Sequence, residues 1–142
     1  MATPQIVIDT NVLVAGLRAR RGSAFRLLTL VGTGRFAIHL SVPLVLEYED
    51  VLLRELPYLQ VTRETVEDLI DFHCSVATCH PIFFLWRPFL RDPKDDMILE
   101  LAVKAGCDLI VTYNTRDFAG VEQFGLRTIE PGVFLQHIGV LP

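Results

Sequence analysis

Two short apolar runs, one near each end of the chain, constrain its fold more than any other feature. The first run, Gln5–Ile8, is followed directly by Asp9, and the second run, Asp108–Thr112, is followed by Tyr113 and Asn114. Both are rich in β-branched residues and lack polar alternation, which is typical of parallel strands that are covered on both faces. We therefore expect both runs to lie inside a parallel sheet.

Helical patterns lie between and after these strands. The predicted helices cover Gly22–Val31, Pro43–Arg54, Arg63–Ala77, Asp95–Ala105 and Pro131–Ile138. Further strand candidates are Phe36–Leu40, a weak one around Ile82–Leu85, and Leu126–Ile129. The alternation predicts an α/β fold, a three-layer α/β/α sandwich with a central parallel sheet. Functional sites in such folds form where loops leave the carboxyl ends of the strands, and Asp9 occupies one such end.

Composition favours a single domain over residues 1–142. The chain is 51% apolar and only 21% charged, which excludes a disordered chain, and its length suffices for one hydrophobic core without disulfides. Its three cysteines cannot all pair with one another, and no signal-like start is present, so we expect a reducing cytoplasm. The apolar runs are too short to span a membrane.

The net charge of −4 argues against a non-specific nucleic-acid binder, but the charge is unevenly distributed. Residues 1–46 hold five arginines and a single acid, Asp9, whereas residues 47–142 hold eight basic and sixteen acidic side chains. Arg18, Arg20 and Arg21 closely follow Asp9. They are either part of a solvated loop or phosphate contacts beside an acidic site.

Glu47 is a candidate site residue because of its helical position. Leu44, Tyr48 and Val51 form an apolar stripe, and Glu47 falls within that stripe. The alternative is that Glu47 lies at the rim of the buried face and extends into solvent, which is the commoner situation for a single acid.

The later helix separates its acids by face. Asp95 precedes Ile98 and Leu99 by three and four positions and so projects from the apolar face. On the other side, Asp96 belongs to a row with Glu100 and Lys104 that we interpret as solvated. Asp92 before Pro93 has the pattern of a helix cap, and an acid in the first turn also favours the helix dipole, which accounts for Asp95 only in part.

Asp9, Glu47 and Asp95 thus form a set of inward acids with no cationic side chain evident among them. Like charges at close range repel unless one is protonated or a cation binds. Ligands that are all oxygen, without cysteine or histidine at chelating spacing, suit Mg²⁺ or Mn²⁺ rather than zinc.

Two other clusters have less specific patterns. His73-Cys74 and Cys79-His80 resemble a zinc cluster, but we interpret them as buried cysteines and surface histidines. Aromatic residues between positions 83 and 89 could stack on bases, although core packing or a dimer interface is the commoner role of such a segment.

The combined motifs resemble a known family. Ile8-Asp9-Thr10-Asn11-Val12, the segment SVPLVLEYEDVL that contains Ser41 and Glu47, and RDPKDDMILELAVKAGCDLIVTYNTRDF at 91–118 are similar to PIN-domain ribonucleases. The chain is specifically similar to VapC-like toxins of prokaryotic toxin–antitoxin pairs. The similarity covers about residues 5–135, and it rests on the order and spacing of the motifs together.

The resemblance implies roles at matching positions. Asp9, Glu47 and Asp95 correspond to the first three family acids, which bind Mg²⁺ or Mn²⁺. Thr10, Asn11, Ser41 and Thr112 fill polar positions of the motifs. Where many members have a fourth acid the chain has Asn114, which supplies no charge, and Asp117 lies three positions further on.

Two functions follow from this resemblance as expectations. The first is a metal-dependent endoribonuclease that acts as the toxin of such a pair, forms a homodimer through an apolar helical face and is restrained by a small antitoxin protein. The second is a catalytically weak or inactive PIN-like module that binds RNA or a protein, because Asn114 replaces the fourth acid.

Overall fold

The computed structural model describes residues 3–81 and 88–142. Its strands are β1 (Gln5–Ile8), β2 (Ala37–Ser41), β3 (Thr78–His80), β4 (Leu109–Val111) and β5 (Arg127–Ile129). Its helices are α1 (Thr10–Arg18), α2 (Ser23–Leu30), α3 (Val42–Arg54), α4 (Arg63–Val76), α5 (Pro93–Lys104) and α6 (Pro131–His137). Short 3-10 turns are η1 (Leu56–Tyr58), η2 (Thr115–Phe118) and η3 (Val121–Phe124).

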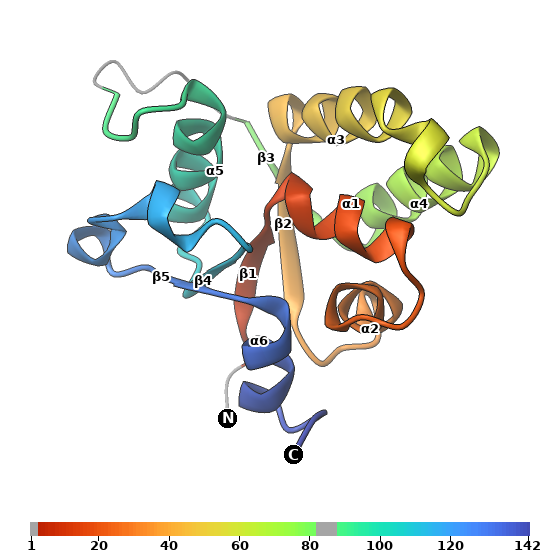
Figure 1. Cartoon of the computed structure of the whole chain (residues 1–142). Helices are drawn as coiled ribbons and strands as arrows, with labels where there is room; N and C mark the ends of the chain where they lie inside the picture. The colour runs from red at the N-terminus through yellow and green to blue at the C-terminus, as the bar shows by residue number, and fades with distance from the viewer. Residues whose placement is uncertain (1–2, 82–87) are drawn as a thin grey trace.

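The strands form one parallel sheet in the order β3-β2-β1-β4-β5. Helices α1 to α4 lie on one side of this sheet, and α5 with the two later 3-10 turns lies on the other (Figure 1). This arrangement follows from right-handed crossovers, because the chain moves outward from β1 in one direction and then returns to β4 in the other. The predicted α/β/α sandwich with a central parallel sheet is confirmed.

The central strands are buried on both faces. Ile6, Val7 and Ile110 have no exposed surface, and neither does Val111 at the end of β4. Complete burial of one such aliphatic side chain contributes roughly 1.5–3 kcal/mol. The absence of polar alternation in these strands is therefore explained by helices packed on each side of the sheet.

Local sequence signals position the two helices that carry acids. Ser41 caps α3, where its Oγ accepts a hydrogen bond of 3.3 Å from the backbone N–H of Leu44. Asp92 caps α5 in the same way, accepting from the N–H of Lys94 at 2.9 Å. The buried Tyr48 of α3 donates its hydroxyl hydrogen to the carbonyl of Ile8, which ties α3 to the end of β1.

The structure also contains elements that the sequence patterns did not predict. Residues 10–18, for which the sequence patterns predicted no helix, form α1. Strand β3 begins at Thr78, directly after the helix that the sequence predicted over Arg63–Ala77. The weak strand expected around Ile82–Leu85 lies outside the described residues. Across the described residues, no helix is long and apolar enough to cross a membrane.

Candidate functional site

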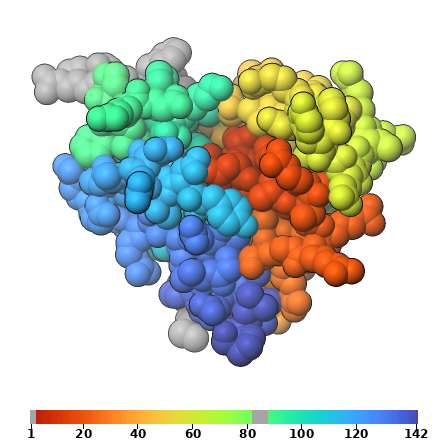
Figure 2. Space-filling model, viewed as in Figure 1, coloured from red at the N-terminus to blue at the C-terminus, as the bar shows by residue number. Residues whose placement is uncertain are grey.

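Asp9 lies at the point where the strand order reverses. Strand β1 pairs with β2 on one side and with β4 on the other, and Ile8 is in register with Val111. The backbone N–H of Asp9 continues this ladder by donating to the carbonyl of Val111 at 2.9 Å. Loops leave the sheet on both sides here, which is the usual position of a ligand site in such folds. The start of α1 reaches the surface between α3 and the η2 region (Figure 2).

A set of hydrogen bonds fixes the Asp9 carboxylate. The Thr112 hydroxyl donates to Asp9 Oδ2 at 2.8 Å, and the Asn11 side-chain amide donates to the same oxygen at 3.3 Å. The Asn11 amide also lies 3.2 Å from Thr112 Oγ1, and Asn11 Oδ1 accepts from the Tyr113 N–H at 3.3 Å. The backbone N–H of Asn114 donates to Thr112 Oγ1 at 2.9 Å. The side chains of Asn11 and Thr112 therefore orient the Asp9 carboxylate.

Burial alters the acidity of Asp9, whose residue is only 7% exposed. Desolvation raises the pKa of this carboxyl above 3.8, and the charges of Asp117 and Glu47 add to the increase. The Thr112 hydroxyl and the Thr10 backbone N–H stabilise the charged form and oppose part of this change in pKa. Asp9 is thus a buried acid whose proton is held more tightly than usual.

Asp95 and Asp117 line the same hollow of about 520 Å³ between the start of α5 and η2. Burial is the largest cause that raises the pKa of Asp95 to about 7, followed by the charges of neighbouring acids, of which Asp9 contributes most. Asp117 is exposed and is among those acids. The structure therefore brings Asp95 and Asp117 into the surroundings of Asp9, although they come from different elements.

Glu47 has a cationic partner that the sequence patterns did not reveal. Its Oε1 lies 3.4 Å from Nζ of Lys94, and its side chain is 17% exposed. The expectation that no positive side chain lies among the acids is therefore wrong. Helical periodicity could not identify this pair, because Lys94 and Glu47 lie on different helices.

Asp96 is also placed differently from the prediction. It is buried, and its Oδ1 accepts hydrogen bonds from the backbone N–H groups of Phe89 at 3.1 Å and Leu90 at 2.8 Å. The segment before α5 folds over this side of the helix. It covers Asp96, the first residue of the row that we interpreted as solvated. Asp96 therefore shapes the loop that leads into the site.

The remaining predicted polar residues, Ser41, Thr10 and Asn114, differ in burial and in hydrogen bonding. Ser41 is buried and its Oγ caps α3. Thr10 is buried beside Asp9, and its Oγ1 has no hydrogen-bond partner in the described structure. Asn114 is exposed at the start of η2.

The arginines of the first third lie to one side of the acids. Arg18, at the end of α1, forms an ion pair of 3.4 Å with Glu55 and lines a hollow of about 370 Å³ that also contains Asn11 and Glu47. Arg20 and Arg21 are exposed in the turn that follows.

Two arginines to which the sequence analysis gave no role line the hollow of Asp95 and Asp117. They are Arg91 and Arg116, and both are exposed. A usable signal was present, because each lies within one or two residues of an acid inside the motifs at 91–118.

No three His, Cys, Asp or Glu side chains in the described part of the chain are grouped so that they could hold a metal ion. In the suspected zinc cluster, the interpretation of buried cysteines and surface histidines is wrong in part. His73 is buried and Cys79 is exposed, while His80 Nε2 lies 2.8 Å from Nδ1 of His39. Cys79 and His80 are consecutive residues of β3, so their side chains point to opposite faces of the sheet, and the residues of the apparent zinc motif are kept apart.

Comparisons with known proteins agree with this fold. The family model of the PIN domain matches residues 5–116. A solved structure of VapBC2 from Rickettsia felis, bound to a DNA fragment from their promoter, contains a similar chain with a TM-score of 0.60 and 14% identity. The similarity covers 89% of this chain and 98% of that chain. No curated protein matches the sequence. The chain therefore belongs to the PIN domain family.

Proposed function

We propose that the chain is a divalent-metal-dependent endoribonuclease that hydrolyses RNA phosphodiester bonds. The observation that supports this most directly is the set of acids at the carboxyl edge of the sheet. Asp9 and Asp95 each have a raised pKa, caused first by burial; the charges of Asp117 and Glu47 add to the increase at Asp9, and those of Asp9 and other acids add to it at Asp95. Raised pKa values caused by burial and by neighbouring acids are characteristic of functional sites.

The chemistry of this set fits a hard cation. Every candidate donor is an oxygen atom, and desolvated carboxylates with raised pKa values gain stability when a positive charge replaces their protons. We propose that Asp9, Glu47 and Asp95 hold Mg²⁺ or Mn²⁺, with Asp117 beside them. When bound, such an ion polarises the phosphodiester and lowers the pKa of the water that attacks it.

The protein's own groups orient the reactants. Thr112 and Asn11 fix the direction of the Asp9 carboxylate through bonds to its Oδ2. Arg91 and Arg116, which line the acid hollow, can hold phosphate oxygens on either side of the reacting group. Arg18, Arg20 and Arg21 extend the positive charge along the α1 side, while Thr10, Ser41 and Asn114 contribute neutral polar atoms.

The test is RNA cleavage by purified protein with Mg²⁺ or Mn²⁺ and with EDTA. We expect Asp9→Asn and Asp95→Asn to abolish most cleavage and Asp50→Asn to retain it, because the exposed Asp50 pairs with Arg54 away from the site. Cleavage that continues in EDTA, or in both site variants, would show that the metal mechanism is wrong.

A second candidate function is a PIN-like module that binds RNA or a protein without efficient catalysis. Three observations favour it: Asn114 carries no charge, Glu47 is already paired with Lys94, and the described acids do not converge on one point. Tight RNA binding without cleavage at any Mg²⁺ or Mn²⁺ concentration would establish this alternative.

We further propose that the chain is the toxin of a toxin–antitoxin pair. Its motifs resemble such toxins, and the similar solved chain belongs to VapBC2. A small antitoxin would insert a peptide into the groove that holds the acids and arginines, and the toxin would act as a homodimer in the cytoplasm. Co-expression with a short reading frame adjacent to the gene should yield a complex that no longer cleaves RNA. A lone gene without such a neighbour would argue against the pairing but not against the nuclease.

A further inference from the structure

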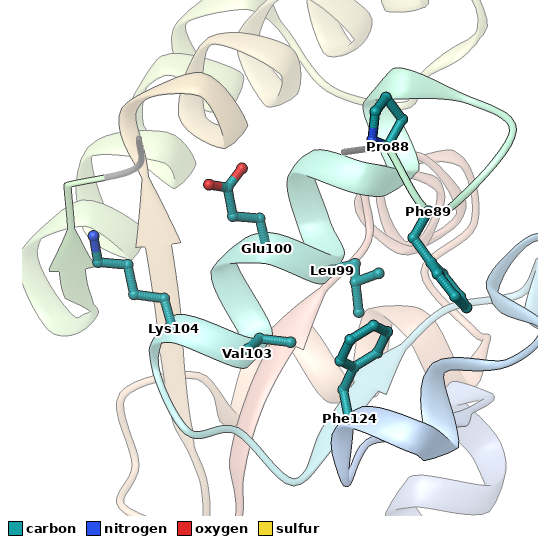
Figure 3. Close-up of a pocket in the computed structure, with 7 residues that line it drawn as sticks. All are labelled: Pro88, Phe89, Leu99, Glu100, Val103, Lys104 and Phe124. Carbon is teal, nitrogen blue, oxygen red and sulfur yellow. The ribbon is translucent and has the colours of Figure 1, made fainter. Parts of the chain in front are cut away.

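Phe89 lies between the acid hollow and a second, apolar hollow. It lines the hollow of Asp95 and Asp117, and it also lines a neighbouring one of about 510 Å³ with Leu99 and Phe124. In Figure 3 the rings of Phe89 and Phe124 lie on the same side of α5 as Leu99 and Val103. A single aromatic side chain thus forms the boundary between a charged site and an apolar one.

Phe89 is held in position even though 41% of its surface is exposed. Its backbone N–H donates to the buried Asp96 carboxylate at 3.1 Å. Its ring meets that of Phe124 edge to face, with centroids 5.1 Å apart. Gly120 makes room for it, because a Cβ at that position would lie 3.0 Å from Cζ of the Phe89 ring.

A fixed aromatic ring that remains exposed is suited to stacking. Phe124 is 44% exposed as well, so the pair has aromatic surface that no described residue covers. Bases of single-stranded nucleic acids stack on such rings irrespective of sequence.

The charges next to Phe89 favour a nucleic acid as the occupant. Among the described residues, Arg91 and Arg116 form no ion pair, although they line the same hollow as three acids. Guanidinium groups without a carboxylate partner are available to phosphate oxygens. A chain whose phosphates pass these arginines brings its bases within reach of Phe89.

We propose that Phe89 and Phe124 form a subsite for one unpaired nucleobase of an RNA whose backbone crosses the acid hollow. The inference rests on the proposed function, because it takes RNA as the substrate. It assigns the apolar hollow to a base next to the reacting phosphodiester and gives Asp96 the role of positioning Phe89.

The test is a set of single-stranded RNAs of one sequence, each lacking the base at one position. Their binding is measured by fluorescence anisotropy in EDTA, where hydrolysis is prevented. With the wild-type protein, loss of one particular base should weaken binding roughly tenfold, as expected for one stacked base. With Phe89→Leu, that same base should no longer matter, whereas Phe89→Trp should preserve its effect.

The control is Phe72→Leu, because Phe72 is 48% exposed but lies on α4, away from the hollow. It should behave like the wild type towards every RNA of the set. If Phe89→Leu does not fold, as judged by its thermal melt, Phe124→Leu is used in its place and should give the same loss of base dependence.

Three outcomes would overturn the subsite. In the first, no single base affects wild-type binding; in the second, the effect of the base persists in both Phe89→Leu and Phe124→Leu. In the third, Phe89→Leu leaves RNA binding unchanged but dissociates a dimer in light scattering, which would assign the hollow to a protein interface. Failure of the proposed function would give a different result. The wild type would then not cleave RNA with Mg²⁺ or Mn²⁺, while the effect of the base on RNA binding would remain.

Discussion

The two flanks of Asp9 contain similar residue types in different states of pairing. On the side of α1 and α3, Arg18 pairs with Glu55, and Glu47 pairs with Lys94 of α5. On the side of α5 and η2, Asp95, Asp117 and Arg116 share a hollow, and none of them takes part in an ion pair with a described residue.

The difference indicates which flank is organised for a ligand. Charges that pair on the surface lose little by remaining solvated and contribute little to stability. Burial, followed by the charges of neighbouring acids, raises the pKa of the unpaired Asp95 to about 7, which is unfavourable for the charged form of the free protein. We therefore expect substitutions on the α5 flank to alter function and substitutions on the α1 flank, apart from the proposed ligand Glu47, to alter it much less.

The largest effect is expected for Asp95→Asn. The amide has nearly the same shape but no charge, so the set of acids loses a ligand, and RNA cleavage should fall on the order of a hundredfold or more. The matched substitution on the other flank is Glu55→Gln, which breaks the pair with Arg18 and should leave the cleavage rate unchanged. Equal losses in the two variants would remove the distinction between the flanks.

Thr112→Val should have the next largest effect. It removes the hydroxyl that donates to Asp9 Oδ2 and accepts from the Asn114 N–H, but it preserves the shape of a fully buried side chain. Loss of an orienting hydrogen bond behind a metal ligand typically reduces activity 10- to 100-fold. Single-turnover cleavage should show this loss, and Thr112→Ser, which keeps the hydroxyl, should recover most of the rate.

Arg116→Gln and Arg18→Gln compare the two flanks for RNA affinity. Arg116 has no carboxylate partner among the described residues, so its removal should weaken RNA binding several-fold and reduce the salt dependence of binding by about one phosphate contact. Arg18 is already paired with Glu55, and its removal should have the smaller effect. A larger effect at Arg18 would place the RNA along α1 instead, as the cluster of arginines at 18–21 suggests.

The sequence predicted the elements that have strong local signals. Helix α3 begins within a residue of the expected position, because Ser41 is a cap and Pro43 stands in the first turn. Helix α1 has no such signals. Asp9 does not cap it with its side chain, and α1 contains several β-branched residues and Gly16. A Cβ at Gly16 would lie 2.6 Å from Cδ1 of Leu28, so this helix depends on close packing against α2.

Some contacts in the site could likewise not be predicted from local sequence patterns. Asp9 was identified from its position at a strand end and Asp95 from its helical face, whereas Thr112 was assigned from the family resemblance. The burial of Asp96 depends on the segment at 88–90, and the partner of Glu47 comes from another helix. Periodicity compares residues only with others on the same helix, so neither contact could be predicted from it.

The pH dependence of stability tests the raised pKa of Asp95. A folded-state pKa of about 7, against 3.8 for the free group, means that the folded protein binds the proton more tightly than the unfolded chain. This contribution to stability is complete below about pH 4 and is lost as the pH rises towards 7. Urea unfolding in EDTA should therefore show stability that falls across this window, and Asp95→Asn should reduce that slope. Asp50→Asn, on the exposed face of α3, should leave the slope as it is.

The smallest effect is expected for Lys94→Gln, which removes the one ion pair between described residues that joins the two flanks. The Lys94 side chain is 57% exposed, so loss of its pair with Glu47 should change the free energy of unfolding by less than about 1 kcal/mol. The ammonium group also offsets one negative charge at the acids, and its removal should increase affinity for Mn²⁺ roughly two- to fivefold. Arg54→Gln makes the same change of charge beside Asp50 and should leave Mn²⁺ affinity unaltered in calorimetric titrations. Weaker Mn²⁺ binding by Lys94→Gln would contradict this expectation and would mean that Lys94 positions Glu47 for the ion instead of competing with it.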